Sequence, residues 1–94
     1  MKKDYELINN TEERQYEFHI DDYVPRIEYM RSTNGEVYLT HTEVPPAIEG
    51  KGIASLLTEK TLCDIEQQGF RLIPLCPFVV DYIRKHPEWK RLMK

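Results

Sequence analysis

The chain has 94 residues, of which 40% are hydrophobic and 31% charged, and its formal net charge is −3. This length and balance are typical of one small globular domain, which we assign to residues 1–94. A net negative chain lacks the broad basic surface that nucleic-acid-binding proteins use, and no apolar run is long enough to span a bilayer. We therefore expect a soluble single-domain protein with neither a nucleic-acid nor a membrane partner.

The cysteines and the first residues indicate the compartment. Cys63 and Cys76 form no CxxC pair, and the sequence shows no disulfide framework. The cysteines and the three histidines also lack the spacing of a metal site, so we expect no metal. The opening MKKDYE has no hydrophobic signal-peptide centre. We expect a cytoplasmic, monomeric protein with free thiols.

The N-terminal part of the chain has the pattern of β-strands. Residues 5–8 form a short, largely apolar segment that ends at a pair of asparagines, which predicts a strand and a turn. In residues 14–20 apolar and polar side chains alternate, which is typical of a half-buried strand. Asp21-Asp22 then predicts the next turn.

A hairpin follows. Residues 23–32 are predicted to form a strand, in which Pro25 indicates an edge, a bulge or a late start of pairing. Asn34-Gly35 is a strong hairpin signal, and residues 36–44 form the returning strand. Strict alternation would divide this strand into two faces. One face would carry Val37, Leu39, His41 and Glu43, and the other Tyr38, Thr40, Thr42 and Val44.

The pattern changes to helical after the hairpin. Residues 53–68 contain neither proline nor glycine and predict a long helix, with Gly69 as its C-cap. Residues 70–75 are mostly apolar and predict a buried strand. Cys76-Pro77 opens a second helix that runs to about residue 85, where His86-Pro87 ends it.

This order predicts an α+β fold with a mixed, mostly antiparallel sheet. The strand at residues 36–44, the long helix and the strand at residues 70–75 form a β-α-β crossover. Because such crossovers are right-handed and join parallel strands, the fourth and fifth strands should be parallel. A short C-terminal helix completes the fold.

The glycine-rich segment Gly50-Lys51-Gly52 lies between the fourth strand and the long helix. It does not fit a Walker A loop, because Pro45 stands at the first glycine position and a glycine follows the lysine. It does not fit the dinucleotide fingerprint, because Ser55 stands at the third glycine. The segment EGKGIASLL instead resembles the pyrophosphate loop of the GNAT acetyltransferases. The structural alternative is a turn whose glycines only allow tight packing of helix on sheet.

The resemblance continues on both sides of this loop. The segments HTEVP (residues 41–45) and PLCPFVVDYIRKHPEW (residues 74–89) resemble the minimal, single-domain branch of the GNAT superfamily, which has a cysteine at the end of the fifth strand. The similarity covers most of the chain from about Glu28 onward. It implies the acyl-CoA N-acyltransferase fold and the transfer of acetyl from acetyl-CoA to an amine. The amine could be a protein lysine, a polyamine or another small amine.

The resemblance also implies where acetyl-CoA would bind. The backbone N–H of Val44 would polarise the thioester carbonyl, and the N-terminus of the long helix would hold the pyrophosphate. The residues implied at the pyrophosphate are Gly50, Lys51, Gly52, Ile53, Ala54 and Ser55. Glu49 departs from the family pattern, because it places a carboxylate where an arginine or glutamine is usual.

Four side chains are candidates for catalysis. Cys76 would cap the second helix, a position that favours a thiolate. A Cys76–His41 pair on adjacent strands could work through an acetyl-cysteine intermediate. Cys76 could also carry a proton or only pack in the core. Glu43 is an alternative base, and Tyr82 resembles the family tyrosine that protonates the departing thiolate. The structural alternatives are a half-buried histidine, a solvated carboxylate and a packed tyrosine. Cys63 is expected in the core.

Two other classes of function remain open at this level. A module that binds CoA without catalysis, or a sensor of acetyl-CoA, would be consistent with Glu49 in the loop. A plain interaction domain would bind no CoA. His41, Glu43 and Cys76 together favour the enzyme.

Overall fold

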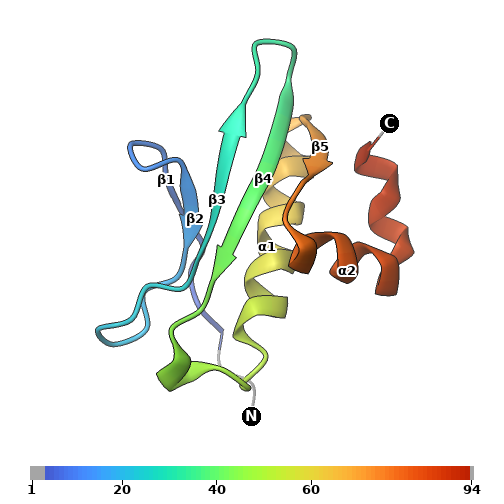
Figure 1. Cartoon of the computed structure of the whole chain (residues 1–94). Helices are drawn as coiled ribbons and strands as arrows, with labels where there is room; N and C mark the ends of the chain where they lie inside the picture. Colours follow the sequence, from blue (N-terminus) through green and yellow to red (C-terminus); the bar gives the residue numbers. More distant parts are fainter. Residues whose placement is uncertain (1–3, 94) are drawn as a thin grey trace.

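A computed structural model describes residues 4–93; residues 1–3, on which the expectation about a signal peptide partly depends, and residue 94 lie outside the described residues. The chain folds into a five-stranded sheet in the order β1-β2-β3-β4-β5, with the helices beside it (Figure 1). The elements are β1 (Ile8–Asn10), β2 (Gln15–Glu17), β3 (Arg26–Arg31), β4 (Glu36–Glu43), η1 (Pro46–Ile48), α1 (Ile53–Gln68), β5 (Arg71–Pro74), α2 (Pro77–Lys85) and η2 (Pro87–Met93).

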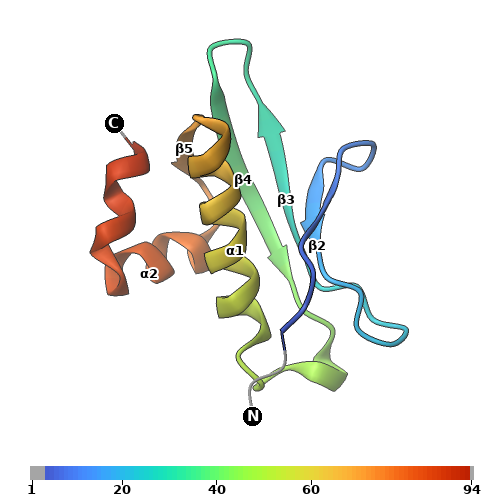
Figure 2. The same ribbon diagram turned by 180° about the vertical axis from the view of Figure 1, so that it is seen from behind.

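Neighbouring strands are antiparallel except for β4 and β5, which are parallel and joined through α1. The expected α+β fold, with a β-α-β crossover and a short C-terminal helix, is therefore confirmed. Figure 2 shows α1 running along one face of the sheet, with α2 and the C-terminal segment beyond the β5 edge. Within residues 4–93 no helix has the length and apolar character that crossing a membrane requires.

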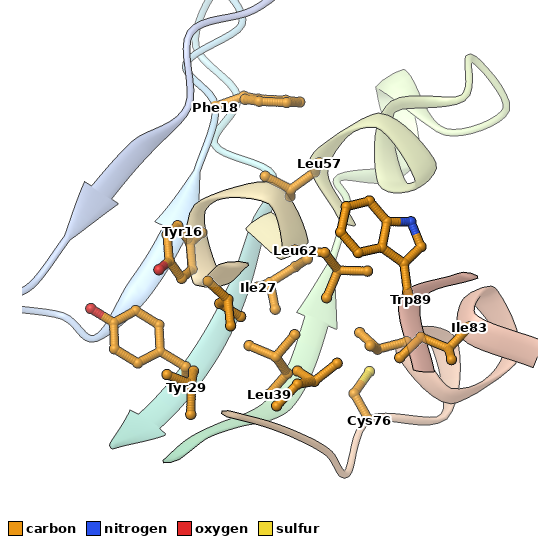
Figure 3. Close-up of a cluster of buried hydrophobic side chains, with 14 of the residues drawn as sticks. Tyr16, Phe18, Ile27, Tyr29, Leu39, Leu57, Leu62, Cys76, Ile83 and Trp89 are labelled. Carbon is orange, nitrogen blue, oxygen red and sulfur yellow. The ribbon is translucent and has the colours of Figure 1, made fainter. Parts of the chain in front are cut away.

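The core lies between the sheet and α1. Side chains from both layers meet there in one cluster, to which η2 adds Trp89 (Figure 3). The largest completely buried apolar side chains of this cluster include Phe18, Ile27, Leu39, Leu57 and Leu62. Burial of such side chains contributes about 1.5–3 kcal/mol each, so this cluster holds α1 on the sheet.

The first strand differs from the prediction. This strand, β1, begins only at Ile8. The two asparagines were expected to form a turn, but they belong to the strand and are paired with β2. The Asn10 side chain stabilises this arrangement, because its amide donates to Glu17 and its oxygen accepts from the backbone of Glu13. The chain therefore turns at residues 11–14, directly after the two asparagines and not at them.

The second predicted strand is regular only over β2, but its alternation is confirmed. Tyr16, Phe18 and Ile20 are all buried, and a tight turn at Asp21-Asp22 connects Ile20 to Tyr23. On the opposite face Glu17 is buried too, at 5% exposure. Its carboxylate is retained there because amide groups of Asn10 and Gln15 and the ring of His19 surround it.

A β-bulge interrupts the pairing of β3 with β4. Glu28 pairs with His41 but Tyr29 pairs with Leu39, so Thr40 has no partner residue on β3. An extra residue of this kind reverses the inward and outward sense of the residues that follow it. The expected faces of β4 are therefore wrong beyond Leu39: Thr42 pairs with buried Ile27 on the α1 side, and His41 pairs with Glu28 on the open side.

The C-terminal half follows the prediction closely. Helix α1 spans Ile53–Gln68, and Gly69 ends it in the left-handed conformation, with φ 76°. Strand β5 and helix α2 lie where expected, with Pro77 in the first turn of α2. The expectation that His86-Pro87 ends the second helix is confirmed, but η2 follows directly and buries Trp89 and Leu92, which the sequence pattern did not predict.

Candidate functional site

Strands β4 and β5 separate halfway along β4. Their pairing runs from Glu36 and Arg71 to Leu39 and Pro74. The carbonyl of Leu39 then accepts from the N–H groups of both Leu75 and Cys76, at 3.0 and 2.9 Å, as the chain turns into α2. Residues 40–43 of β4 continue without a partner on the β5 side, which opens a space at this edge of the sheet.

A cavity of about 380 Å³ lies at this opening. Its wall is formed by the end of β4, the glycine loop, the first turn of α1 and one side chain of α2, Phe78. Six of the residues expected to bind the cofactor line it: Val44, Gly50, Gly52, Ile53, Ala54 and Ser55. Lys51 is exposed in the same loop but is not part of the wall. The loop and the end of β4 therefore meet in one cavity.

Several backbone donors on this wall are free. Among residues 4–93 the N–H of Val44 has no hydrogen-bond partner. The hydrogen bonds of α1 begin with Leu56 N–H to Gly52 C=O at 3.0 Å, so the N–H groups of the first turn have no partner within the helix. Gly50 and Gly52 have φ of 81° and 74°, a conformation that favours glycine. The result is a wall of N–H groups at the positive end of a helix, which suits an anion.

Glu49 also lines the cavity and is exposed. A negative charge in the wall of this cavity opposes the binding of a phosphate. The departure from the family pattern noted in the sequence is therefore located at the cavity itself.

Cys76 caps α2 as expected and is 5% exposed. Figure 3 shows its side chain within the same cluster of buried side chains as Leu39 and Ile83. Its Sγ lies 3.2 Å from Oγ1 of Thr42. Thr42 lines the cavity, whereas Cys76 does not belong to its wall.

The structure does not pair Cys76 with His41. Because of the bulge, His41 and Glu43 lie on the face of β4 opposite to Leu39, whereas Thr42 lies on the same face as Leu39. Their side chains are 52% and 47% exposed, and His41 Nε2 lies 3.1 Å from Glu43 Oε1. His41 thus has a carboxylate partner, which an imidazole needs in order to act as an oriented base. The partner of His41, Glu43, is on the open face of the sheet, whereas the partner of the Cys76 thiol is Thr42.

Tyr82 lies on α2 away from the cavity wall. Its ring packs against His86, with the ring centroids 4.3 Å apart. Burial, with a contribution from Glu59, raises the pKa of Tyr82 above its usual value, so the phenol is protonated at neutral pH. The structure therefore keeps Tyr82 as a protonated donor but does not bring it together with Val44 or the glycine loop.

The expectation that Cys63 lies in the core is wrong. Its side chain is exposed, because Thr61, Leu62 and Ile65 occupy the inner face of α1 and Cys63 points away from it. Partial burial and the neighbouring carboxylates Glu59 and Glu66 raise the pKa of this thiol. Cys63 and Cys76 therefore differ in access to solvent, and the buried one, Cys76, contacts Thr42 of the cavity wall.

Thr42 and Phe78 are two residues of the site that sequence reasoning missed. Thr42 directly follows His41, and Phe78 lies two residues after Cys76; both His41 and Cys76 were candidates for catalysis. Their roles depend on the bulge and on the direction of α2, and neither has a local sequence signal. Within the described part of the chain, no group of histidine, cysteine and carboxylate side chains could hold a metal ion.

The sequence was compared with models of known protein families. The model of the family described as GCN5-related N-acetyl-transferase matches residues 15–92, which includes the sheet from β2 onward, the glycine loop and α2. A search of the curated proteins found no match to the chain. The chain belongs to the GCN5-related N-acetyltransferase family, and its function is of the acyltransferase type.

Proposed function

We propose that the protein binds acetyl-CoA and transfers its acetyl group to an amine. The observation that carries this proposal is the shared cavity wall, which is lined both by Val44, whose N–H is free, and by the first residues of α1, whose N–H groups have no partner within the helix. Acetyl-CoA carries a pyrophosphate and a thioester carbonyl, and each needs donors of this kind. The family supports the chemistry, since its members are N-acetyltransferases.

The pyrophosphate would bind at Gly50–Ser55, with the ammonium of exposed Lys51 adding positive charge nearby. The pantetheine arm would then run along the unpaired edge of β4 toward Val44. Its N–H would donate to the thioester oxygen, and this bond would strengthen as the oxygen gains negative charge during attack. A single such donor contributes about 2.7–4 kcal/mol to an acyl-transfer barrier in other enzymes.

The acceptor would approach from the open face of the sheet. His41 and Glu43 lie there within hydrogen-bond distance of one another, three residues and one residue before Val44. In its neutral form His41 would take a proton from the attacking amine, and Glu43 would orient the ring and stabilise the imidazolium. Carboxylates on this face also favour a cationic acceptor, which agrees with a lysine side chain or a polyamine.

Cys76 and Tyr82 are the remaining candidates. Cys76 lies behind Thr42, which supports a role in proton transfer more than a direct attack on the thioester. Tyr82 is protonated, but its position away from the cavity wall makes it the less direct donor to the leaving sulfur.

The proposal is tested with ¹⁵N-labelled protein titrated with acetyl-CoA. We expect amide shifts at Val44 and across Gly50–Ser55, and shifts near Val44 alone with S-acetylpantetheine, which lacks the nucleotide. Turnover is measured as CoA release, quantified by chromatography, with spermidine and a lysine peptide as acceptors. Shifts in neither segment would overturn the assignment of the cofactor.

A second candidate function is binding of acetyl-CoA without catalysis. The observation that supports it is Glu49, because a carboxylate at the cavity wall is not expected in an enzyme optimised to bind acetyl-CoA. Acetyl-CoA binding without CoA release for any tested amine would favour that module or sensor.

The same samples, examined by light scattering, test the prediction that the protein is a monomer.

A further inference from the structure

We infer that the hydroxyl of Thr42 connects the Cys76 thiol to the cavity, so that Cys76 serves as a proton donor to the leaving CoA sulfur through Thr42. This inference rests on the proposed function for its substrate. Its structural basis is independent: Thr42 Oγ1 lies 3.2 Å from Cys76 Sγ, Thr42 lines the cavity, and Cys76 is 5% exposed and outside the cavity wall.

The position of the hydroxyl decides between two roles of the thiol. A nucleophilic cysteine has to reach the thioester carbon itself, and Thr42 stands between Cys76 and the cavity. A hydroxyl both donates and accepts, so Thr42 can pass a proton that the thiol cannot deliver directly. The bulge at Thr40 is what places this hydroxyl, rather than the imidazole of His41, against the sulfur.

The proton transfer balances in three steps. As the amine displaces CoA, the carbon–sulfur bond of the thioester breaks and the sulfur leaves with the electron pair. The Thr42 hydroxyl gives its proton to that sulfur while the Cys76 S–H gives its proton to Thr42 Oγ1. The thiolate left on Cys76 regains a proton from water by the same route after the products leave, and the amine's own proton goes to solvent through His41.

The first experiment needs no acetyl-CoA. In a Cys63→Ser background, which removes the exposed thiol, the rate of alkylation of Cys76 by iodoacetamide is measured at neutral pH. Thr42→Val removes the hydroxyl at nearly constant volume and should slow alkylation roughly tenfold, because the thiolate loses a hydrogen bond to a charged group. Thr42→Ser should restore the rate to within about twofold. An unchanged rate in Thr42→Val overturns the inference.

Thr40→Val is the matched control. Thr40 lies in the same strand, and its hydroxyl donates to the backbone carbonyl of Glu28 at 3.2 Å rather than contacting the sulfur as that of Thr42 does. It should leave the alkylation rate unchanged. A loss as large as that of Thr42→Val would mean that strand distortion, not the hydroxyl, controls the thiol, and would also overturn the inference.

The second experiment measures turnover with acetyl-CoA and spermidine. Thr42→Val and Cys76→Ala should each lower kcat roughly a hundredfold with little change in KM for acetyl-CoA, and the double variant should lose no more than either. Thr42→Ser should restore kcat. Additive losses, or an acetyl adduct on Cys76 in the intact mass, overturn the relay. Absence of turnover in the unsubstituted protein overturns the proposed function and the relay with it, while alkylation still decides whether Thr42 acts on the thiol.

Discussion

The two halves of β4 differ in what lies on either side of them. Residues 36–39 pair with β3 on one side and β5 on the other, and Val37 and Leu39 are almost completely buried. In residues 40–43 Thr40 is the bulged residue and the other three pair with β3 alone, and all four side chains are half-buried or exposed. We call these the paired half and the open half of β4. The same strand therefore contributes to the core at one end and to the cavity at the other.

This difference separates stability from chemistry within one short strand. The paired half, with α1 packed on it, holds the sheet in place. The open half has no partner strand on the β5 side, and the N–H of Val44 directly after it is free. A free N–H is costly in a buried strand but useful where a ligand supplies the acceptor. Substitutions in the two regions should therefore have different effects, and the predictions below test this separation from the largest effect to the smallest.

The largest loss of stability is expected for Leu39→Ala. Leu39 is completely buried between the sheet and α1, so its truncation leaves a cavity and should lower the free energy of unfolding by about 3 kcal/mol. Urea denaturation measures this loss. Thr42→Val, three residues further on, should change it by less than about 1 kcal/mol. Equal losses for the two variants would remove the distinction between the halves.

Tyr16→Phe tests the polar edge of the same core. The Tyr16 hydroxyl donates to Asp64 Oδ2 at 2.7 Å, and losing this bond should cost about 1.5 kcal/mol at neutral pH. Burial, and then Asp64, raise the pKa of Tyr16 above its usual value. The contribution of the neutral phenol is therefore complete below about pH 10 and is lost as the pH rises further, because the unfolded chain ionises first.

The free energy of unfolding should accordingly fall above about pH 10 in the unsubstituted protein and fall less steeply in Tyr16→Phe. Tyr23→Phe, which changes a more exposed tyrosine, is the control and should keep the original slope. Identical slopes in all three proteins would contradict the role of Tyr16. Chemical denaturation at pH 7 and at pH 10.5 or so is sufficient for the comparison.

Gly52→Ala and Gly69→Ala form a matched pair at the two ends of α1. Both glycines have left-handed φ, 74° and 76°, and an added Cβ meets no atom at either position. Each substitution should therefore cost about 1 kcal/mol of stability through backbone strain alone. Only Gly52→Ala should also weaken acetyl-CoA binding, by several-fold, which isothermal titration measures. Equal affinities in the two variants would count against the loop as the pyrophosphate site.

The smallest effect is expected for Glu49→Gln. Removing this carboxylate from the cavity wall should tighten acetyl-CoA binding about threefold at low salt, and the gain should shrink as salt screens the charges. Stability should not change, because Glu49 is exposed. Glu12→Gln, in the exposed turn after β1, should leave the affinity unaltered. A loss of affinity in Glu49→Gln would mean that the carboxylate helps to hold the ligand.

The elements that sequence reasoning located correctly have local signals. Helix α1 and its C-cap are marked by an uninterrupted helical segment and by Gly69, and α2 is marked by Pro77. The pattern of glycines also pointed to the loop that lines the cavity, and its role in binding stays a prediction. The position of β1 was missed because the Asn10 side chain bonds to groups that a turn pattern does not include.

The side-chain part of the site could not be read from the sequence for a physical reason. Alternation along a strand assigns faces only while the pairing stays in register, and the shift at Thr40 depends on how β3 pairs with β4. The partner of Cys76 was therefore expected to be His41 and is Thr42. Cys63 was misplaced for a related reason, since its neighbours Leu62 and Ile65 define the buried face of α1 better than its own residue type does.

Because Thr40 has no partner on β3, the number of residues in β3 and β4 is as important here as the residue types. Three consecutive residues after it, His41, Thr42 and Glu43, alternate between water and the helix layer. One more residue in β3 that paired with Thr40 would restore regular alternation and exchange their surroundings relative to Leu39. The sulfur of Cys76 would then meet an imidazole in place of a hydroxyl. Two chains with the same HTEVP segment could thus differ in chemistry through one insertion in β3, a change that leaves every residue of the motif intact.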